Sequence, residues 1–157
     1  MEEMKIFSDI KLCQMEELSE EDRTLVETAM KATDNSYSPY SHFRVGAAVR
    51  LSDGKVIQGA NQENAAFSVT ICAERSAIFA AQANYPQLPI VSIAISARNA
   101  DGYTYEPVSP CGSCRQAMVE IEQKYSQPLH ILLYGKKGVY VMDSIRNLMP
   151  LSFVDMK

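Results

Sequence analysis

Short apolar runs that alternate with helical segments constrain the fold of this chain more than any other feature. Apolar runs of strand length cover residues 90–97 (IVSIAISA) and 129–134 (LHILLY), and the segment between them, residues 110–123, has helical spacing. A helix between two such strands predicts a βαβ unit, with both strands in one partly parallel sheet. Because central strands of this kind are buried on both faces, we expect a three-layer α/β/α sandwich.

The rest of the chain predicts further elements of such a fold. A helix should begin near Ser19, whose spacing to Asp22 fits a capping pair, and end before the turn-rich residues 35–39. A Ser-Asp-Gly turn should join two strands at residues 45–51 and 55–59 as a hairpin. The remaining expected elements are a helix at residues 72–84, a loop at 99–108, a strand at 138–142 and a short helix at 144–148.

Composition places the chain among ordinary globular domains. Its 157 residues are 46% hydrophobic and 22% charged, enough to bury a core without disulfides. We expect a single domain over residues 1–157, with residues 1–18 as an N-terminal extension. The net charge of −4 and the lack of a basic run argue against a nucleic-acid partner. The sequence lacks a membrane-spanning apolar stretch and a secretory-type start, so we expect no membrane partner and a cytoplasmic location.

Three of the four cysteines are candidate metal ligands. Cys111 and Cys114 form a C-x-x-C motif, and Cys72 lies 39 residues before it. The motif alone is compatible with a redox pair, a closed zinc site with four protein ligands, or a catalytic zinc with three protein ligands and an open position. Cys13 stands apart, and neither histidine has ligand-pair spacing, so three cysteines favour the catalytic zinc.

The candidate ligands lie at the predicted starts of two helices. A helix N-terminus carries partial positive charge and lowers thiol pKa values, which favours thiolate, the form that binds metal. Glu74 follows Cys72 by two residues, so its carboxylate can point toward the ion without binding it. There it can take a proton from zinc-activated water and deliver it to a substrate. The alternative is that Glu74 only stabilises the helix dipole.

Several segments together resemble the zinc-dependent cytidine deaminases, in particular the small homotetrameric type with three zinc cysteines. The matching segments are CAE at residues 72–74, SPCGSCRQ at 109–116, SPYSHFRVGAA at 38–48 and NQENAA at 61–66. The resemblance implies a mixed five-stranded sheet and one Zn²⁺ per chain, held by Cys72, Cys111 and Cys114. It also implies hydrolytic deamination of cytidine and 2′-deoxycytidine to uridine and 2′-deoxyuridine plus ammonia, in pyrimidine salvage.

The same resemblance implies roles for residues around the metal. Glu74 is the proton shuttle, and subunit contacts or aromatic packing are implied for Tyr40 and Phe67. The implied substrate-binding residues are Phe43 at the base pocket, Asn61 and Glu63 at the ribose hydroxyls, the backbone of Ala73 at the base edge, and Phe153 from a neighbouring subunit, stacked on the pyrimidine.

Two arginines adjoin the predicted zinc ligands. Three thiolates leave a Zn²⁺ site with one net negative charge, which weakens the metal as a Lewis acid. A guanidinium that donates hydrogen bonds to a thiolate would offset this charge. Arg75 is the stronger candidate for this role, and Arg115 is the weaker one.

Other functions remain compatible with these motifs. Another aminopyrimidine nucleoside, such as the antibiotic blasticidin S, is the nearest alternative substrate, although the segments at residues 38–48 and 61–66 favour cytidine. Deamination of RNA, DNA or tRNA fits less well with the acidic charge. A zinc-binding module without activity would leave Glu74 and the open coordination position unexplained.

Overall fold

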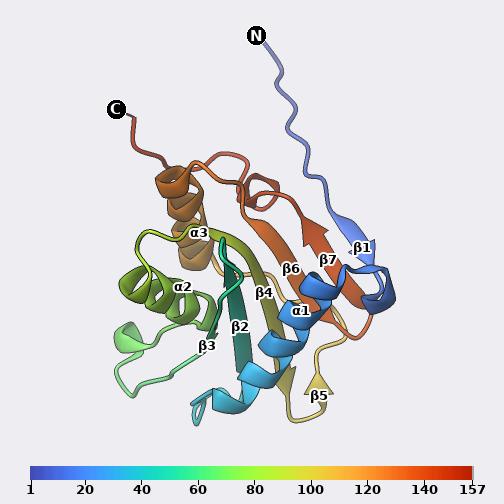
Figure 1. The fold of residues 1–157 in the computed structure, drawn as a ribbon, viewed down its shortest axis with the longest axis vertical. Coiled ribbons are helices and arrows are strands. Elements are labelled where there is room, and N and C mark those ends of the chain that lie inside the picture. Colours follow the sequence, from blue (N-terminus) through green and yellow to red (C-terminus); the bar gives the residue numbers. More distant parts are fainter. Residues whose placement is uncertain (157) are drawn as a thin grey trace.

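The computed structural model describes residues 1–156 and arranges them around one mixed sheet (Figure 1). The strands are β1 (Lys11–Cys13), β2 (Arg44–Leu51), β3 (Val56–Ala60), β4 (Ile90–Asn99), β5 (Gly102–Tyr103), β6 (His130–Gly135) and β7 (Gly138–Met142). Their order is β1-β7-β6-β4-β2-β3, and β5 pairs with β4 outside this path. Strands β4 and β6 pair in parallel, which confirms the predicted βαβ unit.

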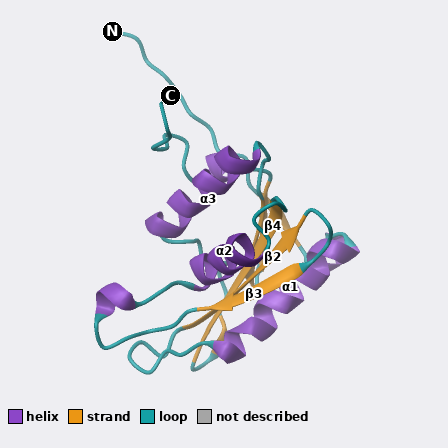
Figure 2. Ribbon diagram, turned by 60° about the vertical axis from the view of Figure 1, so that its left-hand side comes forward, coloured by secondary structure: helices purple, strands orange, loops and turns teal. Residues whose placement is uncertain are grey.

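Helices cover both faces of the sheet, as Figure 2 shows. Helix α1 (Glu20–Ala32) lies on one face, and α2 (Ala73–Asn84) and α3 (Gly112–Tyr125) lie on the other. The short 3₁₀ helices are η1 (Met15–Glu17), η2 (Thr33–Asn35), η3 (Phe67–Val69) and η4 (Ile145–Asn147). The expected three-layer α/β/α sandwich is therefore confirmed.

Two apolar clusters fill the space between the layers. The larger cluster joins the sheet to α2 and α3, and the smaller one joins it to α1. Strand β2 contributes to both, because Ala47 and Val49 belong to the larger cluster and Ala48 to the smaller. Successive side chains of a strand point to opposite faces, so a strand covered on both sides is apolar throughout.

The sheet has seven strands rather than the expected five. Strand β1 lies within the segment that we expected to be an extension, and β5 lies in the expected loop at residues 99–108. Both are two or three residues long and contain no fully buried side chain, so neither produces a periodic apolar pattern. Their positions depend on backbone pairing with β7 and β4.

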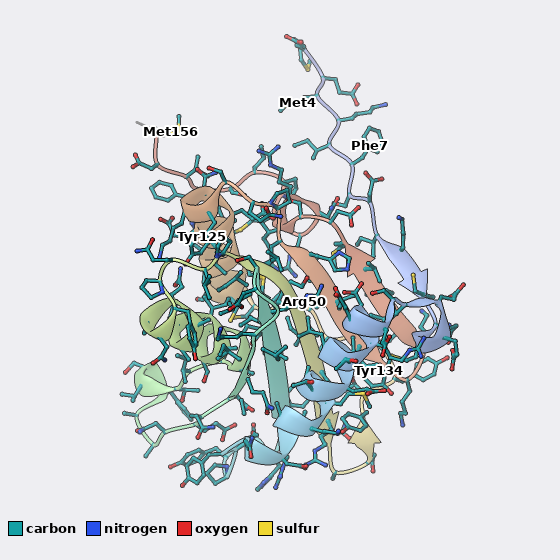
Figure 3. The ribbon with its side chains drawn as sticks, in the orientation of Figure 1. Met4, Phe7, Arg50, Tyr125, Tyr134 and Met156 are labelled. Carbon is teal, nitrogen blue, oxygen red and sulfur yellow. The ribbon has the colours of Figure 1, made fainter. Side chains whose placement is uncertain are left out.

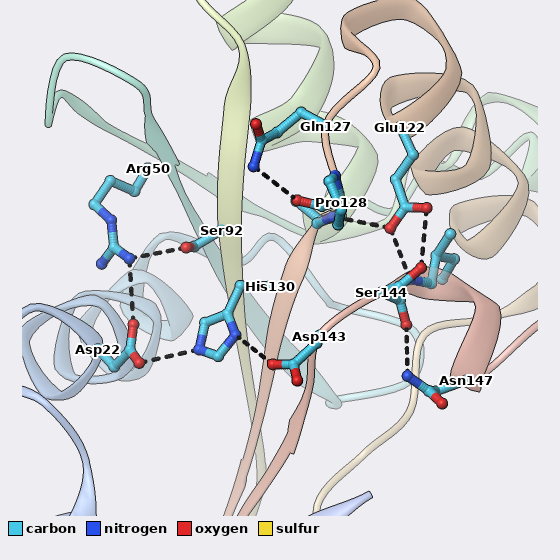
Figure 4. Close-up of polar contacts among 12 residues, drawn as sticks. Asp22, Arg50, Ser92, Glu122, Gln127, Pro128, His130, Asp143, Ser144 and Asn147 are labelled. Carbon is cyan, nitrogen blue, oxygen red and sulfur yellow. Dashed lines mark hydrogen bonds and ion pairs between the residues drawn. The ribbon is translucent and has the colours of Figure 1, made fainter. Parts of the chain in front are cut away.

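A polar cluster ties the beginning of α1 to three strands (Figure 4). Arg50 Nη2 in β2 donates to Asp22 Oδ1 over 3.2 Å and to Ser92 Oγ in β4 over 2.8 Å. Asp22 Oδ2 lies 3.0 Å from Nε2 of His130 in β6, and His130 Nδ1 lies 3.5 Å from Asp143 Oδ1. His130 thus bridges two carboxylates on the face that α1 covers.

The first ten residues extend away from the folded body, with the side chains of Met4 and Phe7 exposed (Figure 3). The backbone N–H of Asp9 donates to Asn147 Oδ1 over 2.8 Å, which brings this segment beside η4. Among residues 1–156, no helix combines the length and the apolar character needed to cross a membrane.

Candidate active site

The three candidate zinc ligands meet at the N-termini of α2 and α3. Cys72 and Cys111 are the N-cap residues of these helices, and neither side chain makes a capping hydrogen bond. Cys114 lies in the first turn of α3 and is buried. The sulfur atoms of all three lie within 4.8 Å of one another. Both helix dipoles therefore favour negative charge at the point where the thiols converge.

The spacing of the sulfurs fits a tetrahedral metal. Zn–S bonds of about 2.3 Å place two sulfurs of a tetrahedral site about 3.8 Å apart. The Sγ atoms of Cys72 and Cys111 are 3.8 Å apart. Among residues 1–156 no fourth ligand joins the three thiols, which would leave one coordination position for water or substrate, the arrangement of a catalytic zinc site. Cys13 lies in β1 and is not a member of this group.

Arg75 contacts the thiol cluster directly. Its Nη2 lies 3.7 Å from Cys72 Sγ, in hydrogen-bonding geometry. Without metal, hydrogen bonds from Cys114 and then from Arg75 lower the pKa of Cys72 to about 5. The pKa of Cys114 is raised because its thiol bonds to Cys72 and is buried. The cluster therefore loses its first proton readily, which favours metal binding.

Arg115 has a different role from Arg75. Its Nε donates to the carbonyl of Pro110 over 2.8 Å, and its Nη1 donates to the carbonyl of Leu148 over 2.7 Å. Arg115 thus binds backbone on both sides of the α3 N-terminus.

Glu74 is a buried carboxyl in the first turn of α2, only 5% exposed. Burial raises its pKa, and the nearby negative charge of Cys72 raises it further. A raised pKa lets a carboxyl hold a proton at higher pH than an ordinary glutamate does, which suits a group that accepts and returns protons. The influence of Cys72 and a hydrogen bond with Cys114 place the Glu74 carboxyl beside the thiols, and its role as a proton shuttle stays a prediction.

A glycine sets how closely α2 approaches the sheet. A Cβ atom on Gly59 in β3 would lie 2.5 Å from the carbonyl oxygen of Ala73 and 2.4 Å from the backbone nitrogen of Ala77. Real Cβ atoms are not found this close to backbone atoms, so a larger residue would move the helix. Gly59 therefore helps to fix the position of the zinc-binding turn.

Asn61 organises the loop before β2. Its Oδ1 accepts hydrogen bonds from Val45 N over 2.8 Å and from Ser36 Oγ over 2.5 Å. Its Nδ2 donates to the carbonyl of Phe43 over 2.9 Å. Both lone pairs of the oxygen are used, and one of the two N–H groups has no partner among these contacts. Asn61 therefore holds the backbone of Phe43 in place, and its predicted contact with the ribose stays a prediction.

Glu63 binds the same loop from the other side. Its carboxylate accepts hydrogen bonds from the hydroxyl of Ser41 and from the backbone N–H groups of Tyr40 (2.8 Å) and Ser41 (3.2 Å). The Ser41 hydroxyl is the main reason that the pKa of Glu63 is lowered. Mutual backbone hydrogen bonds of 3.0 and 3.1 Å join Gln62 and Ile71. This pairing brings Asn61 and Glu63 alongside the residue that precedes Cys72.

Phe153 lies near the C-terminus, and its side chain is 83% exposed. Its predicted role in the site of a neighbouring subunit stays a prediction. Tyr40 and Phe67 pack edge to face with ring centroids 6.2 Å apart, and both are exposed. Sequence reasoning did not identify Ser41 as the partner of Glu63 or Gln116 as a partner of Phe153, because neither pair leaves a local pattern.

Known proteins resemble this chain in sequence and in structure. Residues 19–126 match the family model described as the cytidine and deoxycytidylate deaminase zinc-binding region. A cytidine deaminase from Halalkalibacterium halodurans is 46% identical over 97 residues, which are 62% of this chain and 69% of that protein. A blasticidin-S deaminase from Bacillus cereus is 31% identical over 138 residues, 87% of this chain and 94% of that protein.

The solved structure of a cytidine deaminase from Burkholderia pseudomallei superimposes with a TM-score of 0.71 at 37% identity. The match covers 83% of this chain and 97% of that one. From the family match, the shared fold and the three-cysteine cluster, we conclude that this chain belongs to the zinc-dependent cytidine and deoxycytidylate deaminase family.

Proposed function

We propose that this chain hydrolyses cytidine and 2′-deoxycytidine to uridine and 2′-deoxyuridine plus ammonia, in cytoplasmic pyrimidine salvage. One observation carries the proposal: a buried carboxyl, Glu74, lies beside three thiols at two helix N-termini. A redox pair does not need this carboxyl, and a structural zinc site does not need an open position. Relatives named cytidine deaminase support the choice of substrate.

The metal is held by Cys72, Cys111 and Cys114, one ion per chain. When bound, zinc acts as a Lewis acid that lowers the pKa of water at its open position toward about 7. Three thiolates and one Zn²⁺ together carry a net charge of −1. The hydrogen bond from Arg75 to Cys72 Sγ withdraws electron density from that thiolate and preserves the acidity of the metal.

Glu74 moves the protons of the reaction. As the oxygen of water bonds to C4 of cytosine, the Glu74 carboxylate accepts one water proton and delivers it to N3. The second water proton reaches the amino group at C4 by the same carboxylate. The C4–N bond then breaks, ammonia leaves, and the ring retains a carbonyl at C4 and a proton at N3. The raised pKa of Glu74 suits these repeated transfers.

The nucleoside is held by residues around the zinc-binding turn. The spare N–H of Asn61 and the carboxylate of Glu63 bind the ribose hydroxyls. The first-turn backbone of Ala73 contacts the edge of the base, since amides at a helix N-terminus lack partners within the helix. Phe43, oriented by Asn61, lines the base pocket. Phe153 of a neighbouring subunit covers the pyrimidine in a homotetramer.

Blasticidin S is the second candidate substrate. The similarity to a blasticidin-S deaminase extends over 87% of this chain, a larger share than the similarity to the Halalkalibacterium cytidine deaminase covers. Both reactions would replace the same exocyclic amine, so the zinc cluster and Glu74 do not distinguish them. The difference must lie in the residues that bind the sugar portion.

Four substrates separate these functions in one assay. Zinc-loaded protein is mixed with cytidine, 2′-deoxycytidine, blasticidin S or a cytosine-containing oligonucleotide, and the loss of ultraviolet absorbance and the release of ammonia are followed. We expect turnover of the two free nucleosides and none of the oligonucleotide. Turnover of blasticidin S alone would favour the second candidate. A zinc-replete protein inactive on all four would identify a zinc-binding module without this activity.

A further inference from the structure

Side chains that directly follow a zinc ligand bind the last part of the chain, residues 148–153, here called the C-terminal segment. Gln116 Nε2 donates to the carbonyl of Phe153 over 2.9 Å. Arg115 Nη1 donates to the carbonyl of Leu148 over 2.7 Å. Both side chains come from the first turns of α3, immediately after Cys114. One helix therefore carries two zinc ligands and two anchors of the C-terminal segment.

The C-terminal segment is not packed flat against α3. An open cavity of about 790 Å³ is lined by both, with Val119 and Glu122 from α3 and Pro150 and Ser152 from the segment. Ser152 Oγ donates to the carbonyl of Met149 over 2.6 Å, which gives the segment a local turn. The segment is held by the hydrogen bonds from Arg115 and Gln116 together with the apolar contacts of Leu148 and Met149 with the larger cluster.

Phe153 combines a bound backbone with a free side chain. Gln116 holds its carbonyl, and the next residue, Val154, packs against the larger apolar cluster. The Phe153 ring is nevertheless 83% exposed. Residues so close to a chain end are ordinarily frayed unless something ties them down. A ring presented outward from a tethered backbone suits contact with another subunit better than packing within its own.

Glu122 anchors a different part of the same region (Figure 4). Its carboxylate accepts hydrogen bonds from Ser144 Oγ over 3.1 Å, from Ile145 N over 2.9 Å and from Leu129 N over 2.8 Å. These contacts hold η4, which lies before the C-terminal segment. Glu122 thus fixes the base of the segment, whereas Gln116 acts at Phe153 itself.

We propose that Gln116 is a positioning residue for catalysis, which sets the location of Phe153 and thereby the affinity of a neighbouring site for its pyrimidine. The inference rests on the proposed function, in which Phe153 stacks on the nucleoside of another subunit. Gln116 acts through the Phe153 backbone and touches neither substrate nor metal. Because Gln116 follows Cys114 by two residues, α3 aligns each chain's zinc site with the aromatic ring that it supplies to its neighbour.

A double-mutant cycle tests this coupling. Gln116→Ala should raise the KM for cytidine about 3- to 10-fold, the range expected for one lost hydrogen bond, with kcat and zinc content nearly unchanged. In a Phe153→Ala background, Gln116→Ala should change KM by less than about twofold, because the two residues act through one contact. Gln123→Ala is the matched control, since Gln123 is an exposed glutamine two turns further along α3.

A second variant separates the loss of the hydrogen bond from a general defect in folding. Gln116→Glu keeps the length of the side chain but replaces the donor with a carboxylate, so it should raise KM as Gln116→Ala does. A wild-type KM in Gln116→Glu would overturn the proposal, as would an undiminished effect of Gln116→Ala in the Phe153→Ala background. If Phe153→Ala itself leaves KM unchanged, the stacking role of Phe153 fails, and the role of Gln116 fails with it. If Phe153→Ala raises the KM for cytidine but Gln116→Ala does not, only the positioning role of Gln116 is rejected.

Discussion

Cys72 and Glu74 lie in the same helical turn, but their proposed roles require opposite effects on the charged forms of their side chains. Cys72 must be a thiolate to bind metal, and its position at the N-cap beside Arg75 favours the charged form. Glu74 must exchange protons, and its burial disfavours the charged form. The two demands are compatible because Cys72 is partly exposed, whereas Glu74, two residues further along, is buried.

Replacement of Glu74 by glutamine tests the proton shuttle. Glu74→Gln should lower kcat by about 10²- to 10⁴-fold, the usual contribution of a general acid–base group, or by more because two proton transfers depend on it. Zinc content should stay near one per chain, because Glu74 is not a ligand. Steady-state kinetics and metal analysis on the same preparation measure both. Near-normal turnover in a zinc-replete variant would reject this role.

Replacement of the cysteines tests the ligand set. Cys72→Ala, Cys111→Ala and Cys114→Ala should each lose zinc and activity together, because two remaining thiolates hold the metal poorly. Cys13→Ala is the control and should retain both, since Cys13 lies outside the cluster. Elemental analysis of dialysed protein gives the zinc content per chain. If Cys13→Ala also lost its zinc, the site would be a closed structural one with four ligands.

At the level of elements, the site depends on how closely two helix N-termini approach the same end of the sheet. Gly59 lets the first turns of α2 contact β3, and the parallel pair β4–β6 places α3 beside α2 on the same face. Apolar packing against the larger cluster holds both helices there. The distance between the cysteine sulfurs is therefore set by packing in the layer, not by the local C-x-x-C motif alone.

Gly59→Ala tests this dependence on packing. The added methyl would overlap the α2 backbone, so we expect a loss of about 1–3 kcal/mol in the free energy of unfolding, measured by denaturant titration, together with weaker zinc retention. Gly112→Ala is the control for stability, because a Cβ there meets no atom within 4 Å. A Gly59→Ala protein as stable as Gly112→Ala would contradict the close-approach argument.

At the scale of the whole molecule, three aromatic residues with expected roles in the site or in subunit contacts are exposed in the single chain. Tyr40, Phe67 and Phe153 are 51%, 76% and 83% exposed. Contiguous exposed apolar groups can mark interaction sites, and the paired rings of Tyr40 and Phe67 are candidates for such a contact in the proposed homotetramer. The Phe153 backbone is held by Gln116 while the residue itself is exposed, and the proposed homotetramer would use this exposed ring in a neighbouring site.

Phe153→Ala tests the shared site. Base stacking on an aromatic ring contributes about 1–3 kcal/mol, so the KM for cytidine should rise about tenfold or more while zinc remains bound. Light scattering of the unmodified protein should give the mass of a homotetramer under assay conditions. A fully active monomer would exclude a site that depends on a neighbouring chain.

Much of the fold and the metal site could be predicted from the sequence, because both leave local patterns. The hydrogen bond from Asp22 N to Ser19 Oγ confirms the capping pair at the start of α1, and β7 covers the same residues as the strand predicted at 138–142. The CAE and C-x-x-C motifs identified the three sulfurs that converge. Capping, periodicity and the spacing of Cys111 and Cys114 each depend on residues only a few positions apart, and Cys72, 39 residues earlier, was identified by the CAE motif.

The contacts between residues that are distant in the sequence were decided by the tertiary structure alone. The pairing of β1 with β7 joins residues more than 120 positions apart, and Gln116 and Phe153 are 37 apart. No short pattern encodes such contacts, because they form only after the layers have packed. The sequence by itself determined which residue types are available for the chemistry, and the packing of α2 and α3 on the sheet decided which of them meet.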